Sequence, residues 1–171
     1  MKKILLVVVI IIFITLLLPL AIVWLIGGSG EGQSPIESGT VSVYVSEEDC
    51  VKDMDINEYL KCVVAAEMPA DFEEEALKAQ SVAARTYLYS HIAEKDKGNI
   101  AERHNGAVIC TDSTHCQAYI SEDKRRESWG AGADENWNKI STAVDETTGQ
   151  IMTYNDEIIS AAAWWNANPR R

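Results

Sequence analysis

An apolar run near the N-terminus places the strongest constraint on how this chain can fold. Residues 4–26 are 23 consecutive uncharged and almost wholly apolar positions, and Lys2 and Lys3 precede them. At about 1.5 Å per residue, a helix of this length crosses the hydrocarbon core of a bilayer. The pattern therefore predicts a transmembrane signal anchor over residues 1–27.

A cleaved signal peptide is the alternative interpretation of this run. Its apolar region would usually cover about 7–15 residues and would end in small residues at a cleavage site. The run is longer than that, although small residues do follow it at positions 27–29. We therefore expect an uncleaved, single-pass anchor in the cell membrane. Lys2 and Lys3 favour a cytoplasmic N-terminus, which places the remaining residues outside the cytoplasm.

The rest of the chain has the length and composition of one modest domain. Residues 28–40 are rich in Gly, Ser and Glu, so they predict a flexible tether. The residues beyond it are numerous enough to bury a single hydrophobic core. The chain has 26 acidic and 15 basic residues and a net charge of −11. Such a surface repels phosphate backbones, so nucleic-acid binding is not expected.

The first half of this domain carries clear signals for a strand and a helix. Residues 41–45 alternate β-branched side chains, which is typical of a strand. Asp55 and Glu58 have the spacing of a capping box that opens a helix. Pro69 ends that helix because it restricts the residue before it. Glu67 therefore lies in the last helical turn, on the same side as neighbouring apolar residues.

Further elements follow the same kinds of local signal. Asp71 and Glu74 predict a second capping box, with a helix that extends to about residue 92. Residues 94–108 have the composition of an irregular polar loop. A third helix is predicted over residues 135–147, and residues 150–161 predict a β-hairpin with its turn at Asn155 and Asp156. The predicted fold class is α+β, with one mixed helical and strand domain after the anchor.

Glu67 is the leading candidate for chemistry because it follows an apolar helical stretch in residues 63–69 (VVAAEMP). Cleavage of a glycosidic bond needs an acid that protonates the leaving oxygen, and burial supplies the raised pKa that such an acid requires. The alternative interpretation is a solvated glutamate that only caps or pairs at a helix end. Glu73, Glu74 and Glu75 occupy a first helical turn and are interpreted as structural.

Residues 63–69 together with residues 75–87 (EALKAQSVAARTY) resemble the core motif of the stage II sporulation protein D family. The resemblance runs from about residue 41 to about residue 161. It implies a membrane-anchored lytic transglycosylase that cuts peptidoglycan glycan strands and leaves 1,6-anhydro ends. It also implies a role in engulfment during sporulation, with a wall amidase and a membrane scaffold protein as partners. A catalytic domain over residues 41–163 is expected on this basis.

The resemblance assigns the acid–base role to Glu67, the glutamate of the family's A-A-E-M-P motif. One carboxylate is enough for a transglycosylase, because the sugar's own 6-hydroxyl is the nucleophile. Arg85 lies in the family's A-A-R-T-Y segment, where it would hold substrate or orient the acid. A buried arginine paired to a carboxylate for structural reasons is the alternative. Gln80 and Tyr87 are further candidates for contacts with the glycan.

Two histidines and two cysteines gather within 13 residues in the pattern H-x5-C-x4-H-C, at His104, Cys110, His115 and Cys116. Two imidazoles and two thiolates suit a tetrahedral zinc ion. Four protein ligands would leave no open position, so the ion would be structural. The resemblance supports zinc, because some family members bind it in this region. A Cys110–Cys116 disulfide and a cluster with neither bond nor metal remain alternatives.

The resemblance stops near the C-terminus. Residues 164–171 (WWNANPRR) depart from the family's pattern, and we expect them to be an aberrant tail produced by a frameshift. On this hypothesis the domain lacks its C-terminal part, together with one wall of the substrate groove. The alternative function is therefore a catalytically incomplete, membrane-tethered protein that binds or organises the cell wall. A zinc hydrolase acting on peptides is disfavoured, because it needs an open metal position.

Overall fold

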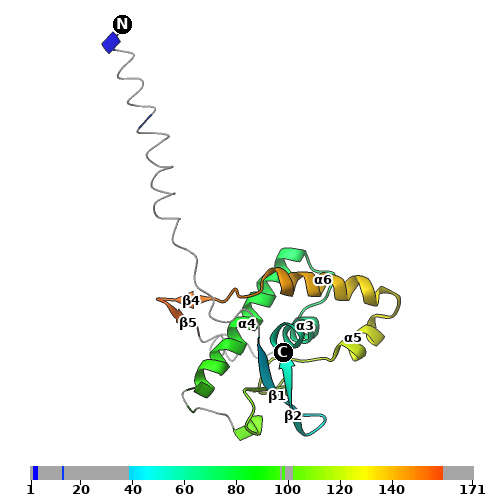
Figure 1. Cartoon of the computed structure of the whole chain (residues 1–171). Coiled ribbons are helices and arrows are strands. Elements are labelled where there is room, and N and C mark those ends of the chain that lie inside the picture. Colours follow the sequence, from blue (N-terminus) through cyan, green and yellow to red (C-terminus); the bar gives the residue numbers. More distant parts are fainter. Residues whose placement is uncertain (1, 4–12, 14–38, 97, 99–101, 160–171) are drawn as a thin grey trace. The chain divides into compact units, whose positions relative to one another are not determined.

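The computed structural model describes residues 2–3, 13, 39–96, 98 and 102–159 (Figure 1). Nearly all of the predicted anchor 1–27, most of the predicted tether 28–40 and all of the predicted tail 164–171 lie outside these residues. Among the residues that are described, no helix combines the length and the apolar character needed to cross a bilayer. All elements from β1 to β5 belong to one compact unit.

A small sheet of three strands forms one side of the core. β1 (Thr40–Val45) pairs antiparallel with β2 (Cys50–Asp55) and parallel with β3 (Ile109–Cys110), which gives the strand order β2-β1-β3. The alternate valines of β1 are buried, so the predicted strand at residues 41–45 is confirmed. β2 was not predicted because its sequence, CVKDMD, has no alternating apolar face.

Helix α3 (Ile56–Glu67) begins and ends where the sequence predicts. The Asp55 carboxylate accepts hydrogen bonds from the backbone N–H groups of Asn57 (2.9 Å) and Glu58 (3.1 Å), which confirms Asp55 as the N-cap. Met68 leaves the helix in an extended conformation, with φ −134° and ψ 134°, as a residue before proline prefers. Glu67 is therefore the last residue of the helix.

Helix α4 (Glu74–Asp96) begins later than the second capping box predicts. The backbone N–H groups of Ala76 and Leu77 donate to the Glu73 carbonyl, so Glu73 rather than Asp71 occupies the N-cap position. Asp71 instead lies in a turn, which the Phe72 N–H closes by donating to the Pro69 carbonyl (3.3 Å). The turn delays the helix, so the predicted N-cap at Asp71 is wrong. The helix also continues beyond residue 92.

Several short elements lie between α4 and the end of the described chain. A helix over residues 122–129 was not predicted, whereas the third predicted helix is confirmed with its start two residues earlier. The elements are η2 (Glu102–His104), α5 (Glu122–Trp129), η3 (Gly130–Gly132), α6 (Ala133–Glu146), β4 (Thr153–Tyr154) and β5 (Glu157–Ile158).

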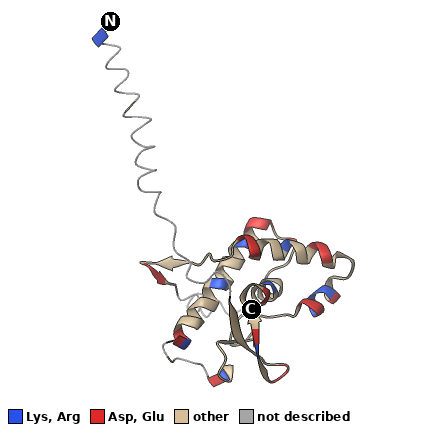
Figure 2. Cartoon of the chain, viewed as in Figure 1, with Lys and Arg blue, Asp and Glu red and all other residues tan. Residues whose placement is uncertain are grey.

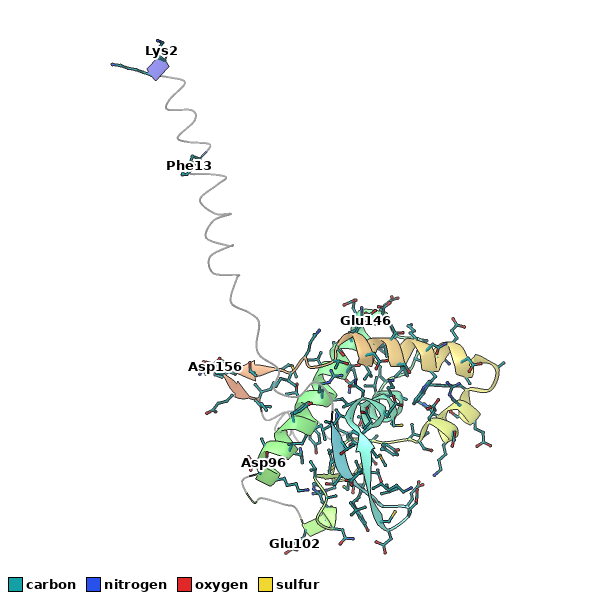
Figure 3. All side chains as sticks on the ribbon, viewed as in Figure 1. Lys2, Phe13, Asp96, Glu102, Glu146 and Asp156 are labelled. Carbon is teal, nitrogen blue, oxygen red and sulfur yellow. The ribbon has the colours of Figure 1, made fainter. Side chains whose placement is uncertain are left out.

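The predicted hairpin forms at β4 and β5, although its strands are short. Asn155 and Asp156 make the turn with φ of 51° and 64°, the left-handed conformation that Asn and Asp tolerate better than most residues. Asp156 marks the tip of the hairpin in Figure 3. The Met152 N–H donates to the Thr86 hydroxyl (2.9 Å), which attaches the hairpin to α4.

The core lies where α3, α4 and α6 pack against one another and against the sheet. Leu60, Leu88 and Ile140 are fully buried, one from each of these helices. Acidic and basic residues occupy the outer faces, as Figure 2 shows for α5 and α6. Glu146, labelled in Figure 3, pairs with Lys78 (2.7 Å) and links the end of α6 to α4. The predicted α+β class is confirmed for this part of the chain.

Candidate active site and metal centre

Glu67 is held in place by a contact from a distant segment. It is partly buried at the end of α3, and its Oε1 atom accepts a hydrogen bond from the backbone N–H of Ala118 (2.6 Å). These two residues are 51 positions apart. A short bond to a backbone donor fixes the orientation of a carboxylate better than solvent contacts do. The side chain is therefore positioned by tertiary structure as well as by its helix.

An open pocket of about 640 Å³ lies beside Glu67. Its volume falls within the range of about 300–1,000 Å³ that is common for small-molecule sites. One part of its lining is the turn after α3, and the other part comes from α5 and α6. The lining residues are Ala66, Glu67, Met68, Pro69, Ala70, Asp71, Arg125, Trp129 and Asn136.

Arg125 and Trp129 form the α5 side of this pocket. The Arg125 guanidinium donates to the Ala65 carbonyl in α3 and also lies over the Trp129 ring, 5.0 Å from its centroid. The Trp129 ring lies 6.4 Å from the ring of buried Trp137, at an interplanar angle of 55°. These contacts connect α5 both to α6 and to the helical turn that carries Glu67.

This side of the pocket was not predicted from the sequence, because α5 was not predicted. A signal was present: Ser121 precedes two acidic residues, and Gly130 follows the helix, which is the usual pattern of helix start and stop. Arg125 and Trp129 are four residues apart and so share one face of α5. Asn136 lies on α6, and no local pattern indicates that it would approach Glu67.

Arg85, which was expected to contact the substrate, does not line the pocket beside Glu67. The side chain of Arg85 is buried with 1% exposure, and it donates to the carbonyls of Val144 (3.0 Å) and Thr147 and to the side chain of Asn57 (3.3 Å). The Arg85 side chain therefore binds the C-terminal end of α6. This arrangement fits the structural alternative, with carbonyls rather than a carboxylate as partners, and it conflicts with direct substrate contact.

Tyr87 and Gln80 also lie outside the pocket beside Glu67. Tyr87 is buried, and its ring packs 4.3 Å from the ring of His91, which was given no role in the sequence analysis. Burial is the main cause that raises the pKa of the Tyr87 hydroxyl, so this group stays neutral. Gln80 is partly exposed on α4. Of the four residues expected to act on the glycan, only Glu67 lines the pocket.

The four predicted metal ligands come together. Their ligand atoms all lie within 4.8 Å of one another, and three of the four residues are buried. His104 Nε2 lies 3.2 Å from Cys116 Sγ, and His115 Nδ1 lies 3.5 Å from Cys110 Sγ and 3.7 Å from Cys116 Sγ. Ligand atoms around a tetrahedral zinc ion are about 3.3–3.8 Å apart, given bonds of about 2.0–2.3 Å. The cluster could therefore hold a metal ion.

Electrostatics within the cluster favour a thiolate. A hydrogen bond from the Cys116 thiol, together with the two imidazoles, lowers the pKa of Cys110. The same bond raises the pKa of Cys116, because a second negative charge beside the first is unfavourable. All four cysteines of the chain are free thiols, so neither a Cys110–Cys116 nor a Cys50–Cys62 disulfide is present.

The metal cluster and Glu67 share one short segment of backbone. Cys116 is two residues before Ala118, whose N–H binds the Glu67 carboxylate. Gln117 between them is buried with 2% exposure. Any ion that binds the cluster therefore also restrains the backbone donor that orients Glu67.

Comparison with known proteins shows the family to which this sequence is related. The family model of stage II sporulation protein, SpoIID, matches residues 44–154. Stage II sporulation protein D of Bacillus amyloliquefaciens is 35% identical over 136 residues, which cover 80% of this chain and 38% of that protein. Its Bacillus subtilis counterpart is 33% identical over 142 residues, or 82% of this chain and 40% of that protein. An amidase enhancer of Bacillus subtilis is 37% identical over 103 residues.

This chain thus spans about two fifths of the length of the two sporulation proteins that it matches. The matched region contains Glu67, the pocket beside it and the whole histidine and cysteine cluster. The resemblance carried by residues 63–69 and 75–87 is confirmed, and the chain belongs to the stage II sporulation protein family.

Proposed function

We propose that this chain carries the acid–base centre of a peptidoglycan lytic transglycosylase that acts in sporulation. The observation that carries the proposal is the position of Glu67: a carboxyl group at a helix end, oriented by the Ala118 N–H, on the wall of an open pocket. Family membership supports a sporulation role, and the relative named amidase enhancer supports a cell-wall setting. Peptidoglycan glycan strands are the proposed substrate.

Glu67 would serve both halves of the reaction. In the first half its protonated carboxyl group donates to the bridging oxygen, and the bond from this oxygen to C1 of the muramic acid residue breaks. In the second half the carboxylate takes the proton of the 6-hydroxyl of the same sugar, as O6 attacks C1 and closes the 1,6-anhydro ring. The proton balance is closed, because Glu67 ends the cycle protonated. No water enters the products.

The position of Asp71 defines the competing chemistry. This second carboxylate lines the same pocket, and most glycosidases that use water have two carboxyl groups. If Asp71 activated water, the products would have reducing ends instead of anhydro ends. Product analysis therefore separates a transglycosylase from a hydrolase on this scaffold.

Zinc is the proposed occupant of the histidine and cysteine cluster. His104, Cys110, His115 and Cys116 would hold it through two nitrogens and two sulfurs, the donor set and spacing that a tetrahedral structural site requires. Such an ion supplies a fixed cross-link and activates no water. The protein's own part is the segment from Cys116 to Ala118, which presents its N–H to Glu67.

The setting at the membrane follows from the sequence and is proposed on that basis. Residues 1–27 would anchor the chain in the cell membrane with the N-terminus in the cytoplasm, so that the domain faces the cell wall. A wall amidase that removes stem peptides and a membrane scaffold protein are the proposed partners. Extraction of isolated membranes with alkaline carbonate tests the anchor: an integral protein stays in the pellet, and recovery in the supernatant contradicts it.

The reaction is tested on the full chain, purified in mild detergent and incubated with glycan strands stripped of their peptides. Mass spectrometry of the products should show 1,6-anhydro ends for the wild type. Glu67→Ala and Glu67→Gln should lower the rate at least about a hundredfold, since general acid–base catalysis contributes about 10²–10⁴. Glu157→Gln is the matched control, because Glu157 is exposed on β5 and should leave the rate unchanged.

Each alternative outcome has a distinct meaning. Products with reducing ends instead of anhydro ends would show that the enzyme is a hydrolase and not a transglycosylase. Glycan binding by a folded wild type without any cleavage would favour the alternative function, a membrane-tethered protein that binds the wall. Equal cleavage by the wild type and by Glu67→Gln would remove Glu67 from the mechanism.

A further inference from the structure

The α5 and α6 side of the pocket beside Glu67 has no role in the acid–base chemistry. It consists of Trp129 and Asn136, with Arg125 behind the indole ring. Trp129 and Asn136 are both partly exposed, so a ligand in the pocket can reach them. The pocket therefore has a wall that could select which group lies next to the bond that Glu67 protonates.

Trp129 is fixed in orientation before any ligand arrives. The Arg125 guanidinium lies over its ring, and Arg125 is itself anchored on the Ala65 carbonyl. Trp137, with 5% exposure, packs beside the same indole. A ring that is already ordered loses little conformational entropy when a ligand stacks on it. An indole at a pocket surface suits the C–H face of a pyranose ring.

Asn136 and Asp71 supply polar groups with spare hydrogen-bonding capacity. Neither side chain has a hydrogen-bond partner within the described part of the chain. The Asn136 amide nitrogen lies over the turn between α5 and α6, 3.5 Å from the Cβ position that an alanine would have at Gly132. A carboxamide can both donate and accept, which matches an acetamido group that does the same.

The charges of the lining disfavour an anionic sugar. The two carboxyl groups, Glu67 and Asp71, face a single cation, and the Arg125 guanidinium already contacts a carbonyl and an indole. A muramic acid residue without its peptide carries a lactyl carboxylate. This carboxylate would add a third negative charge to a lining that has only the Arg125 guanidinium to balance it, and it would be repelled by Asp71. N-acetylglucosamine carries no charge.

We propose that Trp129 and Asn136 form a subsite for an N-acetylglucosamine residue next to the reacting muramic acid residue, an inference that rests on the proposed function. The indole stacks on the pyranose face, and the carboxamide binds the acetamido group. Peptidoglycan alternates its two sugars, so the neighbours of the reacting muramic acid on both sides are N-acetylglucosamine. The assignment therefore holds for either direction of the strand through the pocket.

Binding to a non-cleaving variant tests the subsite separately from catalysis. The full chain with Glu67→Gln is titrated by calorimetry with a β-1,4-linked tetramer of N-acetylglucosamine. Adding Trp129→Ala should raise the dissociation constant at least about tenfold. Trp129→Phe should raise it less, because an aromatic ring remains. Tyr154→Ala, which removes a 73% exposed aromatic side chain on the hairpin, is the matched control and should leave binding unchanged.

The role of Asn136 is tested by a change in selectivity. The Glu67→Gln chain should bind the N-acetylglucosamine tetramer more tightly than a β-1,4-linked glucose tetramer, which has no acetamido group. Adding Asn136→Ala should remove most of this preference and leave the affinity for the glucose tetramer unchanged. Circular dichroism and thermal unfolding of each variant show whether it keeps its fold, and Trp129→Phe provides the readout if Trp129→Ala does not.

Failure of the subsite and failure of the proposed function give different results. If the chain binds the tetramer through Trp129 but the wild type cleaves no glycan, the subsite is supported and the transglycosylase activity is contradicted. Cleavage by the wild type, together with unchanged binding and cleavage after both Trp129→Ala and Asn136→Ala, would reject the subsite alone. Absence of tetramer binding by the Glu67→Gln chain would also overturn it.

Discussion

Arg85 is a cationic side chain that the fold buries almost completely. Its guanidinium donates to the Val144 and Thr147 carbonyls at the end of α6, which carry the partial negative charge of a helix C-terminus. Each carbonyl also accepts a second hydrogen bond, Val144 from the Thr147 hydroxyl (3.1 Å) and Thr147 from the Gln150 N–H (3.0 Å), so the arginine completes the pairing of two buried acceptors. Any effect of Arg85 on activity would therefore pass through the position of α6, which carries Asn136.

Replacement of Arg85 should act mainly on stability. We expect Arg85→Ala to lower the free energy of unfolding by about 3 kcal/mol, because it removes the hydrogen bonds that a buried, charged donor makes to two carbonyls. Arg85→Lys should restore only part of this, since an ammonium cannot reproduce the planar fork of donors. Urea unfolding followed by circular dichroism measures both. A stable Arg85→Ala variant with lost glycan affinity would instead indicate a direct substrate contact.

Cys62 is a residue for which burial makes a pH-dependent prediction. Burial raises the pKa of this thiol from 9.0 to about 11. The unfolded chain therefore ionises first as the pH rises. The stabilising contribution is complete below pH 9.0 and is lost as the pH rises through about 11, and it amounts to roughly 3 kcal/mol.

Two measurements check this prediction for Cys62. The difference in unfolding free energy between the wild type and Cys62→Ala should shrink as the pH is raised from 9 toward 11. In the folded chain at pH 8, Cys62 should also be alkylated much more slowly than partly exposed Cys50, because the thiolate is the reactive form. Peptide mapping separates the two sites. Equal alkylation of both would show that α3 opens readily.

At the scale of elements, α3 is the part of the fold that presents Glu67. Its first turn is capped by Asp55, and its last turn is tied to distant residues by Ala118 and Arg125. The helix is therefore restrained at both ends, and the pocket lies at the C-terminal one. Loosening the N-terminal end should cost stability without removing any group that lines the pocket.

The Asp55 cap gives a direct test of this restraint. Asp55→Ala should lower the free energy of unfolding by about 1 kcal/mol, the usual cost of losing an N-cap. Asp53→Ala removes an exposed carboxylate from β2 and should change the stability by less than about 0.5 kcal/mol. Urea unfolding of the two variants in parallel makes the comparison. Equal effects would mean that the loss of charge, rather than the loss of the cap, is responsible.

At the scale of the whole molecule, the histidine and cysteine cluster joins parts of the chain that have little regular structure of their own. His104 ends η2, Cys110 ends β3, and His115 and Cys116 begin the segment that reaches Glu67. An ion there would cross-link these parts. It would stabilise the folded chain, because the unfolded chain does not hold the four ligands together.

Zinc removal should therefore destabilise the folded chain. A metal-free preparation should gain about 10 °C in Tm when one equivalent of zinc is added, if the ion is present at about a thousand times its dissociation constant. Cys116→Ser should lose most of this gain, whereas Cys50→Ser should keep it. Scanning fluorimetry and elemental analysis give the shift and the stoichiometry. An equal response of Cys116→Ser and the wild type would place zinc elsewhere.

Features that depend on neighbouring residues could be predicted from the amino-acid sequence. The cap at Asp55, the helix end at Glu67 and the turn at Asn155 follow from short-range backbone geometry, which residue type controls directly. The ligand cluster was also visible, because its four residues lie within 13 positions. A local pattern was misleading at Asp71, where a turn delayed the start of α4.

The surroundings of Glu67 depend on contacts between residues that are far apart in the sequence. Its backbone partner Ala118 is 51 residues away, and Arg125 donates to a carbonyl 60 residues earlier in the chain. Arg85 was expected from its sequence motif to contact the substrate. In the structure it instead donates a hydrogen bond to the carbonyl of Val144 in α6, 59 residues later in the chain. Such contacts depend on how whole helices pack. A local sequence pattern does not indicate which distant residue will contact the end of a helix. The pocket could therefore not be predicted from the sequence.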